Sequence, residues 1–215
     1  MTERFTETLR RQSEPAWTAA VEHRFVSELF EGRVPEAVMI RYLVQDHRFL
    51  DSFLTLLGAA IATADTFEAR LRLGRFAGML SGEENTYFLR AFEVLGVNLA
   101  DREQPEDTQP TAGFKSIMRE AAASRSYAAA LAVLNVAEWL YLDWAVRAPR
   151  PLPDNFVHAE WITLHDNPAF RDFVGFLRAE LDRVGPKDAA VTTDFFLRTV
   201  ALERAFFDAV YEGEV

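Results

Sequence analysis

The chain of 215 residues contains no cysteine. Disulfide bonds, thiolate metal sites and a cysteine nucleophile are therefore excluded. Basic side chains are also scarce, since 23 Lys and Arg stand against 33 Asp and Glu, which gives a net charge of −10. Because phosphate binding depends on clustered Lys and Arg, this balance argues against a nucleic acid partner and against an anionic membrane surface.

Long apolar runs are missing as well. No stretch approaches the ~20 apolar residues that a membrane-spanning helix needs. Residues 1–15 are charged and amphipathic, and they lack the apolar core of a signal peptide. We therefore expect a cytoplasmic protein without a membrane anchor.

The composition that remains is that of a globular protein. Hydrophobic residues make up 49% of the chain and aromatic residues 13%, including 18 Phe. A chain of this length forms one domain more often than two. We predict a single domain over residues 1–215, with enough aromatic side chains to build a core and to line a pocket.

Helical periodicity runs through almost the whole sequence, and strand alternation is almost absent. The pattern predicts an all-α protein. We expect a break at Ser81-Gly82, helix ends at Gly32 and Gly96, and a surface loop over residues 98–109. After an opening segment around residues 5–11, the predicted helices cover about residues 15–31, 35–64, 66–95, 111–123, 126–147, 154–164, 168–184 and 188–212.

Three carboxylates, Asp46, Glu138 and Glu203, lie on the apolar faces of predicted helices. Burying an ionised carboxylate is costly unless it is paired, so such residues are candidates for a functional site. The alternative is an internal ion pair with an Arg, or an exposed strip on the same helix. The neighbours one turn away are Tyr42, Leu43, Phe49 and Leu50 for the first, Leu134, Tyr141 and Leu142 for the second, and Val200, Phe206 and Phe207 for the third.

Motifs for metal or phosphate binding are absent. The four histidines, His23, His47, His158 and His165, show no HxxxH or ExxH spacing, and the Glu-x-x-His pairs of helical di-iron proteins do not occur. There is no Gly-rich phosphate loop and no serine in a nucleophile-elbow sequence. We predict that the protein uses no metal and no cofactor.

Several short segments, in their order and spacing, resemble the TenA family, also called the thiaminase II family. The resemblance runs from Phe5 to about Glu212 and implies an all-α bundle of the heme-oxygenase-like type. The segments that carry it are Tyr42–Asp46 with Phe49, Pro110-Thr111, Glu138–Tyr141, Trp161-Ile162 with His165, and Leu202-Glu203 with Phe206–Asp208.

The resemblance implies roles for individual residues. In that family, an Asp in the position of Asp46 contacts the amino group of an aminopyrimidine. A Glu in the position of Glu203 approaches a ring nitrogen, and a Tyr in the position of Tyr141 lines the pocket. We expect the pyrimidine to lie between rings such as Phe49, Tyr141 and Phe206.

The chain departs from the cysteine-dependent branch of this family at three positions. The slot of the cysteine nucleophile is Ala137, and Glu138 follows it, as in the branch that has no cysteine and carries a Glu. Two pocket tyrosines of the cysteine branch correspond to Phe114 and His165. The loss of a phenol at Phe114 removes one hydrogen bond, and His165 supplies another polar group.

The leading hypothesis is a hydrolase of thiamin-salvage type that acts on an aminopyrimidine or its formylated derivative. Glu138 would activate water, and Glu203 would protonate a ring nitrogen. One alternative is a cofactorless or metal-dependent oxidase related to the pyrroloquinoline-quinone synthases and di-iron oxygenases, with His47 and His165 as ligands or proton shuttles. The other is a binding protein without catalysis. The resemblance also implies a homo-oligomer, a dimer or tetramer.

Overall fold

The computed structural model describes residues 3–212, which fold into helices and connecting turns with no β-strand among them. None of these helices is long and apolar enough to cross a membrane. In chain order the helices are α1 (Phe5–Gln12), α2 (Ala16–Val21), α3 (Arg24–Phe30), α4 (Glu36–Thr63), α5 (Phe67–Met79), the π-helix η1 (Leu80–Glu84), α6 (Asn85–Val94), α7 (Leu99–Glu103), α8 (Gln109–Ala123), α9 (Tyr127–Ala145), α10 (Phe156–Leu164), α11 (Pro168–Val184), the 3₁₀ turn η2 (Gly185–Asp188) and α12 (Ala189–Ala209).

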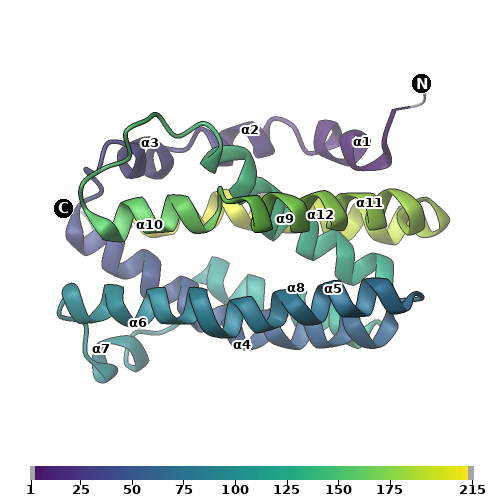
Figure 1. The fold of residues 1–215 in the computed structure, drawn as a ribbon, viewed down its shortest axis with the longest axis horizontal. Coiled ribbons are helices and arrows are strands. Elements are labelled where there is room, and N and C mark those ends of the chain that lie inside the picture. Colours follow the sequence, from purple (N-terminus) through teal and green to yellow (C-terminus); the bar gives the residue numbers. More distant parts are fainter. Residues whose placement is uncertain (1–2, 213–215) are drawn as a thin grey trace.

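Helix α9 lies at the centre of the bundle. It packs against α11 and α12 above and against α4 and α8 below, in the orientation of Figure 1. Nearly every residue from Tyr127 to Ala145 is buried, as expected for a helix that is apolar on all sides. The few polar side chains of α9 must therefore face an internal partner or a cavity.

The predicted helix over residues 15–31 is wrong in one respect, because the structure divides it into α2 and α3. His23 has an extended backbone, and its Nδ1 accepts a hydrogen bond of 3.0 Å from the backbone N–H of Phe25. This bond caps α3 and replaces the helical bonds that would continue from α2. The apolar stripe is nevertheless buried at all four of its positions, Trp17, Val21, Phe25 and Leu29.

The predicted break at Ser81-Gly82 is also wrong. The backbone stays helical from α5 to α6, and it widens over η1 into a π turn. A π turn inserts one residue into an α-helix, and such insertions occur often at functional sites. The predicted ends at Gly32 and Gly96 are confirmed, since both glycines have a positive φ, of 64° and 68°.

The polar segment over residues 98–109 contains the short helix α7, capped by reciprocal bonds between Asn98 and Asp101. Its end is fastened to α4 by one side chain, because Gln45 donates to the carbonyl of Glu106 and accepts from the N–H of Thr108, both at 3.0 Å. The loop is therefore attached to α4 directly beside Asp46.

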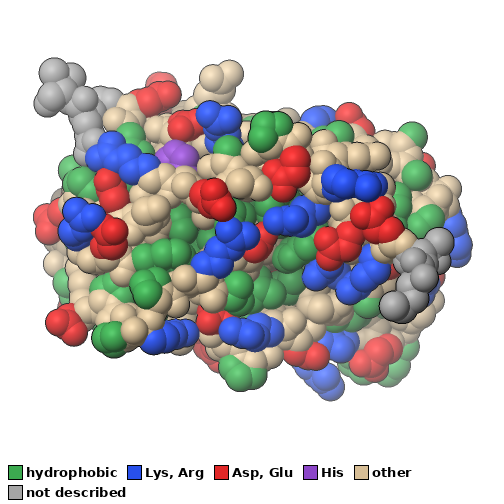
Figure 2. Space-filling view, turned by 90° about the horizontal axis from the view of Figure 1, so that it is seen from above, with side chains coloured by type: hydrophobic (Ala, Val, Ile, Leu, Met, Phe, Trp, Pro, Cys, Tyr) green, Lys and Arg blue, Asp and Glu red, His purple; other side chains and the backbone are tan. Residues whose placement is uncertain are grey.

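Acidic and basic side chains are interspersed over the face shown in Figure 2 rather than gathered into patches. Ion pairs between elements include Arg4 with Asp182 at 2.5 Å and Arg183 with Asp65 at 2.6 Å. Exposed pairs of this kind contribute little to stability. The basic side chains on this face are thus distributed among carboxylates.

Candidate active site

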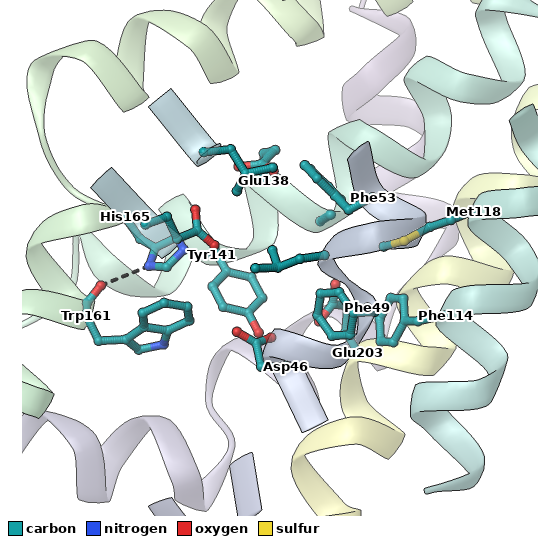
Figure 3. A pocket seen from close by; sticks show the side chains of 14 residues that line it. Asp46, Phe49, Phe53, Phe114, Met118, Glu138, Tyr141, Trp161, His165 and Glu203 are labelled. Atoms are coloured by element: carbon teal, nitrogen blue, oxygen red, sulfur yellow. Dashed lines mark hydrogen bonds between the residues drawn. The ribbon is translucent and has the colours of Figure 1, made fainter. Parts of the chain in front are cut away.

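One pocket collects most of the residues that the sequence singled out. It spans about 450 Å³, part of which is open to solvent, and it lies between α4, η1, α8, α9, the end of α10 and α12. Figure 3 shows Glu138 at one end of the pocket and Asp46 at the opposite end. The lining residues are Asp46, Phe49, Leu50, Phe53, Leu80, Glu84, Phe114, Met118, Ala137, Glu138, Tyr141, Trp161, His165 and Glu203.

Helix α4 supplies one wall of the pocket through its spacing. Asp46, Phe49, Leu50 and Phe53 follow one another at intervals of three and four residues, which places them on one face of the helix. The solvent-exposed polar residues of the same stretch lie on another face of the helix, where Asp51 pairs with Arg119. The face predicted from periodicity is therefore the face that meets the pocket.

The carboxylates Asp46, Glu138 and Glu203 share this pocket although they come from three different helices. Their residues are only 4%, 7% and 2% exposed. None of the three forms a hydrogen bond or an ion pair with another part of the chain in residues 3–212, and no Lys or Arg lines the pocket. The alternative of an internal ion pair with Arg is thus not what the structure contains.

A fourth carboxylate, Glu84, lines the same pocket from η1. The sequence analysis missed it, because the run Ser81-Gly82-Glu83-Glu84 has the polar composition of a helix break. The π turn carries Leu80 and Glu84 to the pocket side of the helix. No apolar periodicity marks this position, so only the backbone geometry reveals it.

Burial dominates the protonation of this cluster. It raises the pKa of Glu138 well above the usual range, and the negative charges of Glu84, Glu203 and Asp46 raise it further. Burial and the charge of Glu84 also raise the pKa of Asp46, and burial and the charge of Asp46 raise that of Glu203. The empty pocket therefore favours protonated carboxyls, and it favours ligands that bring positive charge or hydrogen-bond donors.

Three buried side chains form a hydrogen-bond chain beside the pocket. The indole Nε1 of Trp161 donates to the hydroxyl of Tyr42 at 3.1 Å, and this hydroxyl lies 2.9 Å from that of Tyr141. The Tyr42 oxygen has a second lone pair, so either tyrosine hydroxyl can donate to the other. Tyr141 can therefore meet a pocket ligand as a donor or as an acceptor. Burial raises the pKa of both phenols, so they stay protonated.

His165 presents an acceptor to the same pocket. Its Nδ1 lies 2.8 Å from the backbone carbonyl of Trp161, and since a carbonyl only accepts, Nδ1 carries the hydrogen. Burial lowers the pKa of His165 to about 4, so the imidazole is neutral at physiological pH. Its Nε2 is therefore unprotonated and can accept a hydrogen bond from a ligand.

Two phenylalanines form the apolar wall. Phe49 and Phe114 line the pocket with ring centroids 5.4 Å apart. Phe206, which we expected to touch the ligand, lies behind them, 5.7 Å from the ring of Phe49 and 6.0 Å from that of Phe114. It is 1% exposed and supports the wall instead of facing the cavity.

His47 lies away from the pocket lining. It contacts Asn85 at 3.2 Å and packs against the rings of Phe88 and Phe92. Among residues 3–212, no three His, Asp or Glu side chains are grouped as a metal ion would require. The two histidines named in the oxidase hypothesis therefore do not face one site.

Because Ala137 lines the pocket, a cysteine introduced at this position is expected to be accessible to a small thiol reagent. In the cysteine-free chain, Ala137→Cys would place the only thiol of the protein in the pocket lining, and we expect a small maleimide to modify it without unfolding. The control is Ala132→Cys on the same helix, where the side chain is fully buried and modification must wait for opening. Mass spectrometry measures both rates, and equal rates would contradict this placement of Ala137.

The raised pKa of Glu203 predicts an unusual stability change. Burial gives this carboxyl a higher pKa in the folded protein than in the unfolded chain. As the pH rises from about 4, the unfolded chain ionises first, and the folded state becomes progressively less stable relative to it. We expect Glu203→Gln to stabilise the protein at pH 8 by about 1–2 kcal/mol, or about 2–8 °C, and to have little effect near pH 4.

The matched control for this change is Asp143→Asn in α9. Asp143 accepts a hydrogen bond of 2.7 Å from Trp17 and pairs with Arg147 at 2.9 Å, so its neutralisation should lower the melting temperature. Calorimetric scans from pH 4 to 8 measure both variants. A melting temperature of Glu203→Gln below that of the parent at pH 8 would show that Glu203 has a stabilising partner.

Comparisons with known proteins agree with the fold. A TenA homologue from P. horikoshii OT3 superposes with a TM-score of 0.88 at 23% identity, over 98% of this chain and 100% of that one. A domain of unknown function with a heme oxygenase-like fold from Shewanella denitrificans superposes with a TM-score of 0.70 at 14% identity, over 96% and 92% of the two chains. The predicted all-α, heme-oxygenase-like bundle is confirmed.

The sequence comparisons agree with the motifs. A protein of Halalkalibacterium halodurans named aminopyrimidine aminohydrolase is 25% identical, over 96% of this chain and 95% of its own length. The model of the TENA/THI-4/PQQC family matches residues 10–213, which is nearly the whole chain. The protein therefore belongs to the TENA/THI-4/PQQC family, as the order and spacing of its motifs indicated.

Proposed function

We propose that this protein is a hydrolase of thiamin-salvage type that acts on an aminopyrimidine or its formylated derivative, a degradation product of thiamin. The observation that carries the proposal is an aromatic pocket in which four carboxylates face a cavity without any basic partner. The relative from H. halodurans, named aminopyrimidine aminohydrolase, supports the same class of substrate. Such a ligand supplies the donors that the carboxylates lack.

Asp46 and Glu203 are the groups that recognise the pyrimidine. Asp46 accepts hydrogen bonds from the exocyclic amine. Glu203, which is protonated because burial raises its pKa, donates to a ring nitrogen. The flat ring fits against Phe49 and Phe114, whose faces supply apolar contact. Burial raises the pKa of Asp46 as well, and a bound amine that donates to its carboxyl oxygens favours the ionised form. An acceptor at Asp46 beside a donor at Glu203 then matches an amine beside a ring nitrogen.

Glu138 is the base that activates water. Its neighbour Ala137 removes the option of a cysteine nucleophile, so water must attack the reacting carbon directly. The water oxygen bonds to this carbon while its proton passes to Glu138. When the leaving group is a protonated amine, the C–N bond breaks, its electron pair stays on nitrogen, and the products are an alcohol and a neutral amine. In the formylated case water attacks the formyl carbon, and Glu138 passes the proton it took to the amide nitrogen, which leaves as a neutral amine. The formic acid product then returns a proton to Glu138 as it ionises to formate.

The protonation of Glu138 is set by its ligand. In the empty pocket burial and like charges keep it protonated, which would make it inactive as a base. A substrate that carries a positive charge lowers the pKa of a nearby carboxyl and lets it ionise. Catalytic competence then follows from binding. A ring nitrogen protonated by Glu203 supplies the positive charge where the amine is formylated, and an analogue that stays neutral at both its amine and its ring would bind without activating Glu138.

The test is a thermal-shift screen of aminopyrimidines, their formylated derivatives, thiamin and quinone precursors, followed by an assay for released amine or formate. A ligand at 100 times its Kd should stabilise the protein by about 2.7 kcal/mol. Turnover of an aminopyrimidine is the expected result. Stabilisation without turnover of any of them would indicate a binding protein, and turnover of quinone precursors alone would indicate an oxidase.

We further propose that the protein acts in the cytoplasm as a homo-oligomer of one domain per chain. Exposed apolar side chains such as Phe67, 72% exposed, and Val94, 66% exposed, would be covered in such an assembly. Light scattering of the purified protein measures its mass. The mass of a single chain would contradict the oligomer without affecting the proposed reaction.

A further inference from the structure

Glu84 occupies a position that no other pocket carboxylate has. It lines the main pocket, and it also lines a second cavity of about 320 Å³ between the end of α5, η1 and the turn from α10 to α11. On the side of this second cavity its neighbours are Glu83, which is exposed, and Asn167, which is half-buried. Glu84 therefore separates the main pocket from a cavity that reaches the surface.

The other titratable groups of the pocket are more deeply buried than Glu84. Asp46, Glu138 and Glu203 are all buried, and so are Tyr141 and His165. Glu84 is half-buried, the least buried of the titratable side chains that line the pocket in the described part of the chain. It is therefore the acidic side chain of the pocket best placed to exchange a proton with the second cavity.

The charge of Glu84 also acts directly on the site. Of the negative charges that raise the pKa of Glu138, that of Glu84 has the largest effect, followed by those of Glu203 and Asp46. No other acidic group raises the pKa of Glu84, which burial alone brings to about 7. The carboxyl of Glu84 therefore exchanges protons readily near neutral pH.

We propose that Glu84 carries protons between Glu138 and the solvent, an inference that rests on the proposed hydrolysis. In that reaction Glu138 takes one proton from the attacking water, and the amine leaves with the protons it brought. Glu138 is then protonated and must lose this proton before the next cycle. The carboxylate of Glu84 accepts it at the pocket side and releases it into the second cavity, so one proton and one amine leave for each water consumed.

The π turn gives this assignment its structural basis. Leu80 and Glu84 each line both cavities, so the wall between them is one turn of helix thick. In an unbroken α-helix the inserted residue of the π turn would be absent, and Glu84 would rotate along the helix face. The widened turn thus places the ionisable side chain of Glu84 in the wall between the two cavities, beside the apolar side chain of Leu80.

The experiment compares Glu84→Gln with Glu93→Gln in α6, where the side chain is exposed and lines neither cavity. In dilute buffer, Glu84→Gln should lower kcat on an accepted aminopyrimidine by about 10²-fold while KM changes little. Addition of imidazole, a small proton carrier, should restore much of this loss. The parent and Glu93→Gln should keep full kcat and show no response to imidazole, and Glu84→Asp should keep part of the rate.

Two results would overturn the assignment while the proposed function stands. The first is a parent-like kcat for Glu84→Gln in dilute buffer, and the second is a loss of kcat that no imidazole concentration restores. If the parent itself turns over no aminopyrimidine, the proposed function fails and the proton route fails with it. Melting temperatures of all variants establish that each is folded at the assay temperature.

Discussion

Replacing Glu138 by Gln is expected to lower the turnover of an accepted aminopyrimidine by about 10²–10⁴-fold, the contribution of a general base. Gln has nearly the same shape and polarity as the protonated Glu that fills the empty pocket, but it cannot accept a proton from water. We therefore expect the variant to fold normally and to bind the pyrimidine with a Kd within a few-fold of the parent. Steady-state kinetics and calorimetric titration measure the two effects separately.

A control for Glu138→Gln is Glu93→Gln in α6, where the side chain is exposed and far from the pocket lining. This variant should keep parent activity. If Glu138→Gln keeps full activity on every accepted aminopyrimidine, Glu138 is not the base. Its burial among apolar neighbours would then have to be explained by another role of the pocket.

Replacing Asp46 by Asn is expected to weaken aminopyrimidine binding by about 10–150-fold, which corresponds to the 1.5–3 kcal/mol of a hydrogen bond to a charged group. Asn keeps the size of the side chain, but it replaces one acceptor oxygen by an amide that donates. The exocyclic amine would then meet a second donor. Calorimetric titration of the variant with the pyrimidine measures the change in Kd.

Asp51→Asn is the matched control for Asp46→Asn. It is the same substitution on the same helix, but Asp51 is exposed and pairs with Arg119 at the surface, so the Kd should not change. An unchanged Kd in Asp46→Asn would mean that the amine binds elsewhere. Glu138 would then be the first alternative to test, since it lies at the opposite end of the pocket.

Periodicity predicted which side of each helix faces the interior, and the structure confirms this for Asp46, Glu138 and Glu203. It could not predict that the three side chains meet, because the meeting depends on how α4, α9 and α12 pack against one another. The resemblance to a known family supplied that step. The local sequence thus determines which face of each helix is buried, whereas the packing of the helices determines which side chains meet in one site.

The errors of the sequence analysis have local physical causes. The division of α2 from α3 depends on one histidine nitrogen that caps a backbone N–H, and apolar spacing contains no sign of it. The pocket position of Glu84 depends on one inserted residue in η1. Phe206 has the spacing of a pocket residue, but Phe49 and Phe114 lie between it and the cavity. In each case one capping bond, one inserted residue or one intervening ring determines where the side chain lies, and apolar periodicity records none of these.

The hydrogen-bond chain of Trp161, Tyr42 and Tyr141 leaves the pocket with one adaptable polar group and one fixed one. Either tyrosine hydroxyl can donate to the other, so Tyr141 can meet a ligand atom as donor or as acceptor. The neighbouring Nε2 of His165 offers only a lone pair, because Nδ1 carries the hydrogen. A flat ligand is therefore oriented by the donor that it presents to His165, whereas the atom that it presents to Tyr141 can be of either kind.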